Sequence, residues 1–149
     1  MLSESIPTAK FIAKDLGYYP GDPLLAHRCD FTVAAFWDAN NALFDAMQVS
    51  PEEAKSAAIE KVVMTTFPAF MDKIEPGLGK MTWLAGEKLS VADFWVGAWM
   101  CDCVMNDKHP MSGKFKMLLK KYPNISRWGA AFYWENSLHM SMRDQTQPY

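Results

Sequence analysis

The sequence contains no apolar run that approaches the roughly 20 residues a membrane-spanning helix needs. Its first twenty residues also lack the order of basic, apolar and small-residue regions that marks a signal peptide. Glu4 and Asp15 are acidic and the first arginine is Arg28, which argues against a transit peptide. We therefore predict a cytoplasmic protein without a membrane span, in which any targeting segment would precede Met1.

Cysteine is also scarce. The three thiols Cys29, Cys101 and Cys103 form an odd, small set that is typical of a reducing compartment with free cysteines. Cys101 and Cys103 are two residues apart in a helical stretch, so they point to different faces and are predicted to be buried thiols. The histidines are scattered without ligand-like spacing, at His27, His109 and His139. We predict no metal site, no metal cofactor and no hydrolase triad.

The chain also lacks a large excess of either positive or negative charge. The net charge of the 149-residue chain is -2, so nothing indicates a nucleic-acid partner. What the chain does have is 50% hydrophobic and 21% charged residues, the balance of a globular protein that buries a sizeable core. Its length is that of one ordinary domain.

Strand signals are nearly absent, and helix signals fill the first third of the chain. Ser5 and Gly17 have the residue types of a helix start and stop, which predicts a short helix from Ser5 to Asp15 with Ser5 as its N-cap. A turn-rich linker follows at residues 18–23. Asp22 as cap and Pro23 at the first position then predict a long helix to Met47.

Two capping signals predict the middle helices. Ser50 as cap, with Glu53 completing a capping box, predicts a helix to about residue 74 with a kink at Pro68. Ser90 and Asp93 have capping-box spacing, with Asp in place of the usual Glu or Gln. The helix they start is apolar around most of its circumference as far as about residue 106, so we expect it to be the buried centre of the fold.

The last third of the chain completes the pattern. A helix is predicted at residues 112–121, and Asn124 is predicted to cap a final helix that runs to about residue 138. The segment 141–149 is polar and unpatterned. The predicted fold class is all-α, a helical bundle around the central helix of residues 90–106.

Three segments, in this order and at these distances, resemble the glutathione transferases. They are Glu4-Ser5 with the linker Gly17-Tyr18-Tyr19-Pro20-Gly21-Asp22-Pro23; the turn and capping box from Trp83 to Phe94; and Tyr122-Pro123-Asn124-Ile125-Ser126-Arg127-Trp128. The resemblance covers residues 2–135, and its second segment is the most specific. It implies the all-helical C-terminal domain of that family.

The resemblance also implies a domain division. Residues 1–17 would be the last helix of a thioredoxin-like domain, residues 18–23 the linker, residues 24–140 the helical domain and residues 141–149 a tail. The thioredoxin-like domain of the family supplies most of the glutathione site and the activating residue. We therefore assign no catalytic residue to this chain, and expect it to be inactive by itself.

Glu4 and Ser5 are the candidate glutathione-binding pair. A helix N-terminus presents unsatisfied N–H groups and partial positive charge, which suit a carboxylate. The resemblance implies that Ser5 meets the γ-glutamyl carboxylate and that Glu4 helps to hold the amino group. The alternative is that Ser5 only caps the helix. Asp38, on the next helix, resembles an acidic residue that reaches glutathione's ammonium group across a dimer interface; the alternative is a solvated helix face.

Apolar side chains of the first long helix are candidates for a second subsite. In the family this helix borders the pocket for an apolar electrophile, which implies that role for Phe36, Trp37, Phe44 and Met47. The alternative is that they are plain core or interface residues.

Two functions remain open. The chain is either the helical part of a homodimeric glutathione transferase, with glutathione as substrate, or a non-catalytic assembly subunit of a larger complex. The uncovered apolar side of the helix at residues 5–15 also predicts association with a partner. Whether the native protein extends upstream of Met1 would discriminate between them; the sequence does not indicate the electrophile or the class within the family.

The purified chain should show no measurable conjugation of glutathione to 1-chloro-2,4-dinitrobenzene. The reason is that the resemblance places the activating residue in the preceding domain, and loss of even one oxyanion-type donor costs about 100-fold or more. A spectrophotometric assay measures this, and turnover clearly above the uncatalysed rate would contradict the prediction.

Overall fold

A computed structural model describes residues 4–142, and it contains helices without any strand in that range. One isolated bridge pairs Trp83 with Gly86. The elements, in chain order, are α1 (Ser5–Asp15), α2 (Pro23–Met47), α3 (Glu52–Lys61), the π-helical segment η1 (Val62–Thr66), α4 (Phe67–Leu78), α5 (Val91–Trp99), the π-helical segment η2 (Met100–Met105), α6 (Ser112–Leu119), α7 (Pro123–Glu135) and α8 (Ser137–Met142). The predicted all-α class is confirmed.

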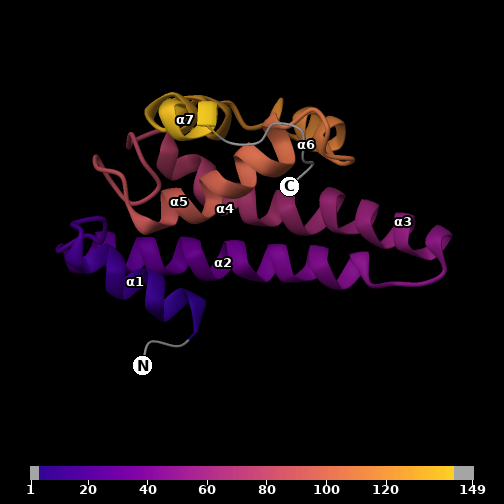
Figure 1. Ribbon diagram of the computed structural model, residues 1–149, viewed down its shortest axis with the longest axis horizontal. Coiled ribbons are helices and arrows are strands. Elements are labelled where there is room, and N and C mark those ends of the chain that lie inside the picture. The colour runs from indigo at the N-terminus through magenta and orange to yellow at the C-terminus, as the bar shows by residue number, and fades with distance from the viewer. Residues whose placement is uncertain (1–3, 143–149) are drawn as a thin grey trace.

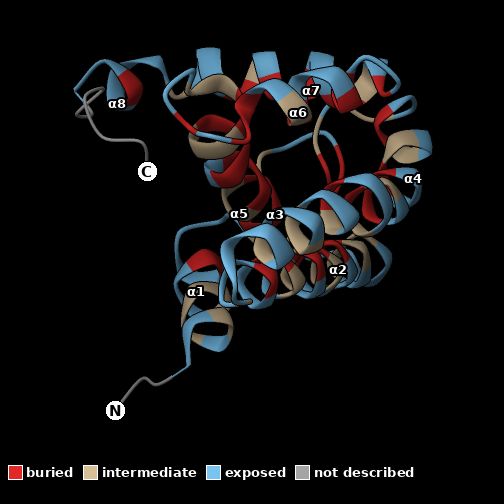
Figure 2. Ribbon diagram, turned by 90° about the vertical axis from the view of Figure 1, so that its right-hand side faces the viewer, coloured by how far each residue is buried: buried red, intermediate tan, exposed pale blue. Residues whose placement is uncertain are grey.

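The long elements form a layered bundle. α2 and the run α3–η1–α4 lie side by side along the longest axis and point in opposite directions (Figure 1). α5 crosses between this pair and α6–α7, and most of its residues are buried (Figure 2). The central-helix prediction is therefore confirmed. Within residues 4–142 no helix has the length and apolarity that crossing a bilayer requires.

The start of α2 follows its sequence signal, whereas the start of α1 does not. Asp22 accepts hydrogen bonds from the backbone N–H groups of Leu24 and Leu25, each at 2.9 Å, with Pro23 in the first turn. In α1 the N-cap is Glu4, and no side chain caps the helix. Ser5 is the first helical residue, so its prediction as N-cap is wrong. The reason is that Glu4, with φ 68 in the left-handed region, is the last non-helical residue. The helix therefore begins at Ser5, one residue earlier than an N-cap at Ser5 implies.

The second predicted long helix is three elements. Pro51 is the N-cap of α3 and no side chain caps it, so the capping box predicted from Ser50 and Glu53 is wrong. The helix is interrupted by η1 just before Pro68. Proline lacks an N–H group and its ring crowds the carbonyl four residues earlier, and a π-helical turn accommodates both effects. The break predicted at Pro68 thus takes this form.

A buried carboxylate organises the centre of the bundle. Asp93 accepts four hydrogen bonds: from the N–H groups of Leu84 and Ser90 at 2.9 Å each, and from the Ser90 hydroxyl and the Trp128 indole at 2.8 Å each. The predicted capping box is present. Burial raises the pKa of Asp93, while these hydrogen bonds act in the opposite direction. The carboxyl group therefore joins the loop before α5, the start of α5 and the middle of α7.

α4 and α7 cap each other through long side chains. The carboxylate of Glu75 accepts hydrogen bonds from the backbone N–H groups of Asn124 and Ile125, each at 2.9 Å. In return Arg127 donates to the carbonyl of Leu78, at 2.6 Å, where α4 ends. Tyr122 is the N-cap of α7 and Pro123 follows it, so the prediction that Asn124 caps this helix is wrong. The cap comes from a residue 49 positions away.

α1 packs on the bundle through one apolar stripe. Ala13 is buried, and Ile6 and Ala9 pack against the core, as their spacing predicts. Leu16 shares that spacing but is 64% exposed, because the helix ends at Asp15 and Leu16 is its C-cap. Two large apolar side chains outside this stripe, Phe11 and Ile12, are exposed as well.

The C-terminal part differs slightly from its prediction. α7 ends at Glu135, three residues before the predicted end, and α8 continues to Met142. α8 therefore includes two residues of the predicted tail, and residues 143–149 of that tail lie outside the described residues.

Removing the Asp93 carboxylate should destabilise the fold more than removing the Ser90 hydroxyl. Ser90→Ala loses a cap contact, for which we expect about 0.5–2 kcal/mol. Asp93→Ala leaves several buried donors without an acceptor, for which we expect at least about 3 kcal/mol. Urea unfolding with an unchanged slope measures both. An Asp93→Ala midpoint equal to that of the wild type would contradict the role of this carboxylate.

Candidate ligand-binding site

One cavity lies between two helical stripes that face each other. On α2 the stripe recurs at helical spacing, at Phe36, Asn40, Leu43, Phe44 and Met47. On α5 and η2 it recurs in the same way, at Trp95, Ala98, Trp99, Asp102 and Cys103. His109 and Met111 complete the wall of this space of about 510 Å³, which we call the α2–α5 cavity. It has the size and the apolar lining of a small-molecule site.

Three of the four residues predicted for an electrophile pocket line the α2–α5 cavity: Phe36, Phe44 and Met47. Trp37 does not line it, because its ring packs edge-on against Trp95 with the centroids 5.4 Å apart. The sequence reasoning missed the whole α5–η2 side of the wall. The signal was present, since the residues from Trp95 to Cys103 repeat at the spacing that identifies one face of a helix.

Aromatic packing holds the deep wall of this cavity in place. Trp99 is 5% exposed and stacks on Phe67 with the ring centroids 5.1 Å apart. Phe115 meets Trp99 edge-on at 5.0 Å, and Phe36 lies 6.1 Å from it on the cavity side. Such packed rings restrict rotamer changes, so the cavity is formed before any ligand enters.

Three polar groups in the wall are electrostatically linked. Burial raises the pKa of Cys103 to about 12, and the negative charge of Asp102 adds to this effect. Burial lowers the pKa of His109, and the same carboxylate opposes the shift. The Met111 N–H donates to His109 Nδ1 at 3.2 Å, so the neutral ring carries its proton on Nε2. Near neutral pH these two side chains are therefore a thiol and a neutral imidazole.

The residues predicted to bind glutathione lie at the surface. Glu4 and Ser5 are exposed at the N-terminal end of α1, and Asp38 is exposed on α2. Within residues 4–142, no hydrogen bond or ion pair joins any two of the three. With no side chain capping α1, its first turn keeps backbone N–H groups that could meet an anion. The structure therefore leaves the glutathione role of these residues as a prediction.

A polar cluster that the sequence reasoning missed fastens α1 to α2. Lys10 Nζ lies 2.5 Å from Asp30 Oδ2, and the Tyr19 hydroxyl donates to the same oxygen at 2.9 Å. The hydrogen bonds to Asp30 and Tyr19 raise the pKa of Lys10. No local pattern indicates this cluster, because its members come from a helix, the linker and a second helix.

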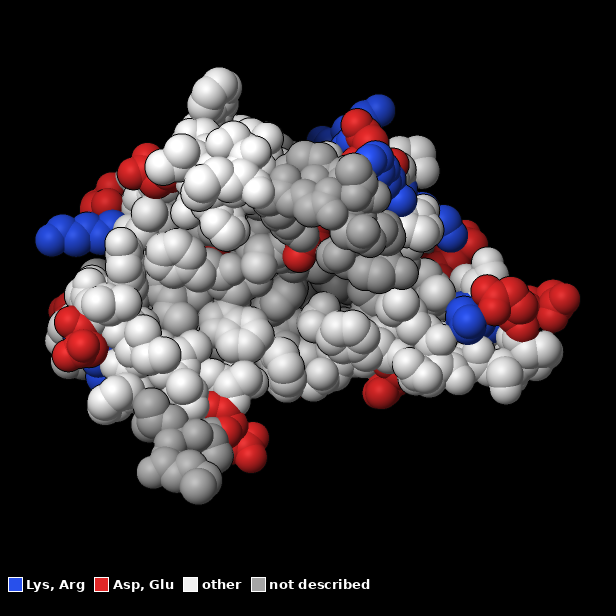
Figure 3. Space-filling view, in the orientation of Figure 1, with Lys and Arg blue, Asp and Glu red and all other residues white. Residues whose placement is uncertain are grey.

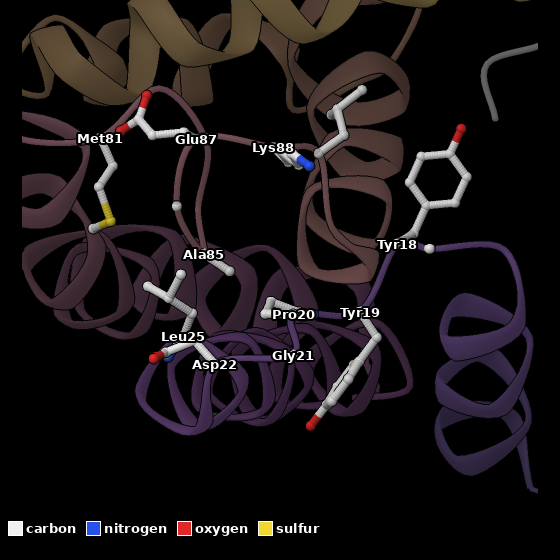
Figure 4. Close-up of a pocket in the computed structure, with 13 residues that line it drawn as sticks. Tyr18, Tyr19, Pro20, Gly21, Asp22, Leu25, Met81, Ala85, Glu87 and Lys88 are labelled. Carbon is white, nitrogen blue, oxygen red and sulfur yellow. The ribbon is translucent and has the colours of Figure 1, made fainter.

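A second cavity, of about 500 Å³, lies between the linker and the loop before α5. Figure 4 shows the ring of Tyr19 directed away from Glu87 and Lys88 across this space. Glu87 also binds the hydroxyl of Thr82, at 2.6 Å. Its polar side chains thus do not converge on one point, and the α2–α5 cavity is the better candidate site. No group of three or more His, Cys, Asp or Glu side chains within residues 4–142 is arranged to hold a metal ion.

Comparisons with known proteins agree with the all-α fold. The family described as "Glutathione S-transferase, C-terminal domain" matches residues 37–138. The solved structure of prostaglandin synthase D of Nilaparvata lugens is similar in fold, with a TM-score of 0.71 and 18% sequence identity. The match covers 89% of this chain and 63% of that one, so this chain spans less than two thirds of its structural relative. No curated protein matches the sequence.

Cys103 should react very slowly with iodoacetamide in the folded protein. A thiol with a pKa of about 12 has roughly 10⁻⁴ of its population as thiolate at pH 8, and the thiolate is the reacting species. Its alkylation rate should rise about tenfold per pH unit over the alkaline range. Intact-mass spectrometry measures the adduct, and Cys103→Ser identifies its position. Alkylation as fast as that of an unfolded control would show the prediction wrong.

Proposed function

The chain belongs to the glutathione S-transferase family through its C-terminal domain, and from this premise we propose that it is the helical part of a glutathione transferase that conjugates glutathione to apolar electrophiles. The observation that carries the proposal is the α2–α5 cavity, whose walls include three of the four residues expected to contact an electrophile. The same cavity faces α2, the helix that also holds Asp38.

The two proposed subsites share a neighbour in Trp95. This residue lines the α2–α5 cavity, and it also lines a smaller space next to Ile6 and Pro7 in the first turn of α1. A glutathione molecule whose γ-glutamyl carboxylate meets the α1 N-terminus would thus lie on the side of Trp95 opposite the electrophile. Such proximity converts a reaction between two solutes into one between held neighbours.

In the proposed reaction the thiol of glutathione loses its proton, and the thiolate sulfur forms a bond to an electrophilic carbon. The carbon's bond to a leaving group breaks, and the leaving group departs with that electron pair. The α1 N–H groups and Ser5 would hold the carboxylate, and Glu4 and Asp38 would face the ammonium group. The α2–α5 cavity would remove water from the electrophile. No described residue is assigned the activation of the thiol, which we place in a thioredoxin-like domain.

Partners follow from the same proposal. The exposed apolar side chains of α1, Phe11 and Ile12, together with its C-cap residue Leu16, would contact the sheet of a thioredoxin-like domain, as the division at residues 1–17 expects. Asp38 would reach glutathione across a homodimer. We place this reaction in the cytoplasm, where glutathione and reduced thiols occur together.

The alternative is a non-catalytic assembly subunit. It is favoured by three exposed apolar side chains that recur every four residues through α7 and α8, at Trp134, Leu138 and Met142. An assembly subunit needs no ligand in the α2–α5 cavity, so ligand binding discriminates between the two functions.

S-hexylglutathione should bind the chain more tightly than glutathione, because its hexyl group adds apolar contact in the α2–α5 cavity. Phe44→Ala should weaken the binding of S-hexylglutathione by about tenfold and leave the affinity for glutathione unchanged. Ser5→Glu should weaken the binding of both ligands by at least about tenfold, because it places a negative charge where the carboxylate of glutathione would lie. Isothermal titration calorimetry measures all of these affinities.

Matched controls keep this test specific. Met117→Ala removes an exposed apolar side chain on α6, and Ser56→Glu adds the same charge on α3; neither residue lines the cavity. Both control variants should bind like the wild type. Undetectable binding of S-hexylglutathione, or equal binding by every variant, would overturn the proposed function and favour the assembly subunit.

A further inference from the structure

The α2–α5 cavity combines apolar walls with a single type of charge. Eight of its twelve lining residues are apolar, and the polar ones are Asn40, Asp102, Cys103 and His109. Neither lysine nor arginine is among the described residues that line it. On the face of the molecule drawn in Figure 3, basic side chains lie mostly at the periphery. The fixed charge in the cavity wall is therefore the carboxylate of Asp102.

The position of Asp102 follows from the helical stripe. It lies seven residues after Trp95 and next to Cys103, on the same face of α5–η2 as the aromatic wall. Its field reaches the other polar groups of the wall, since it raises the pKa of Cys103 and opposes the lowered pKa of His109. Burial lowers the pKa of His109, which favours the neutral imidazole near pH 7.

A ligand's own charge must then decide how well it enters. A carboxylate loses hydration on entering an apolar cavity, which is costly without a partner of opposite charge. Here it would also meet a like charge within the same wall, and like charges in a partly buried site repel more strongly than in water. A neutral apolar molecule avoids both costs.

We propose that the α2–α5 cavity selects neutral apolar ligands against carboxylate-bearing ones of the same size, and that Asp102 sets this selection. The inference rests on the proposed function, in which the cavity holds the electrophile, and it names the class of electrophile as uncharged. Fatty acids and other lipids with a carboxylate head are thereby poor ligands of this site.

Displacement of the neutral dye Nile red from the full chain tests the selection near pH 7.5. Decan-1-ol should displace the dye at a concentration at least about tenfold lower than decanoate. Decylamine, which also loses hydration but carries a positive charge, should displace it at a lower concentration than decanoate. Comparing decanoate with decylamine reports the sign of the electrostatic field in the cavity of the wild-type protein, without any substitution.

Asp102→Asn then assigns the field to one residue. This substitution should strengthen the binding of decanoate by about tenfold and weaken that of decylamine, while the affinity for decan-1-ol stays unchanged. The matched control is Asp107→Asn, which removes a charge five residues further along outside the cavity lining and should leave all three ligands unchanged. Urea midpoints of both variants check that they fold.

Three results would overturn the proposal: Nile red does not bind, decanoate displaces it as well as decan-1-ol or decylamine, or a folded Asp102→Asn variant keeps the wild-type ratios. Displacement of the dye requires neither glutathione nor turnover. Loss of charge selection would therefore leave the S-hexylglutathione titration intact, whereas failure of the proposed function would appear in that titration.

Discussion

The buried carboxylate of Asp93 is the interaction on which the rest of this structure depends. Its two oxygens satisfy donors from the loop before α5, from the first turn of α5 and from Trp128 on α7. Burying a carboxylate is costly, and burial accordingly raises the pKa of Asp93; four hydrogen bonds offset that cost. Because the donors come from three segments, the bonds set the position of α5 and its rotation about its axis together.

The rotation of α5 decides which of its residues form the candidate site. With Asp93 turned toward Trp128, the stripe that begins at Trp95 faces α2 and becomes one wall of the α2–α5 cavity. Close approach of α7 on the other side needs Gly97, where a Cβ atom would lie 2.4 Å from the ring of Phe132. The candidate ligand site is therefore a consequence of how the central helix is held.

Local signals predicted those features whose causes are local. The start of α2 follows from Asp22 and Pro23, which act within one turn, and the capping box of α5 follows from Ser90 and Asp93. The same reasoning failed at α7, because a residue far away in the sequence supplies the cap. There the side chain of Glu75 takes the role that was expected of Asn124. Of the twelve residues in the cavity wall, three were predicted, all on α2, because the resemblance pointed to that helix alone. The α5–η2 side also has helical spacing, but the resemblance did not point to it.

By itself the sequence determined the all-α class, the central helix and the family, because capping residues and apolar spacing act over a few positions along the chain. Only the tertiary structure decided which stripes face each other across the α2–α5 cavity, and that Lys10, Tyr19 and Asp30 fasten α1 to α2. It also placed Asp102 in an apolar wall, where burial and a shared field govern Cys103 and His109. These features depend on distances between segments far apart in the chain, and a sequence pattern carries no such distances.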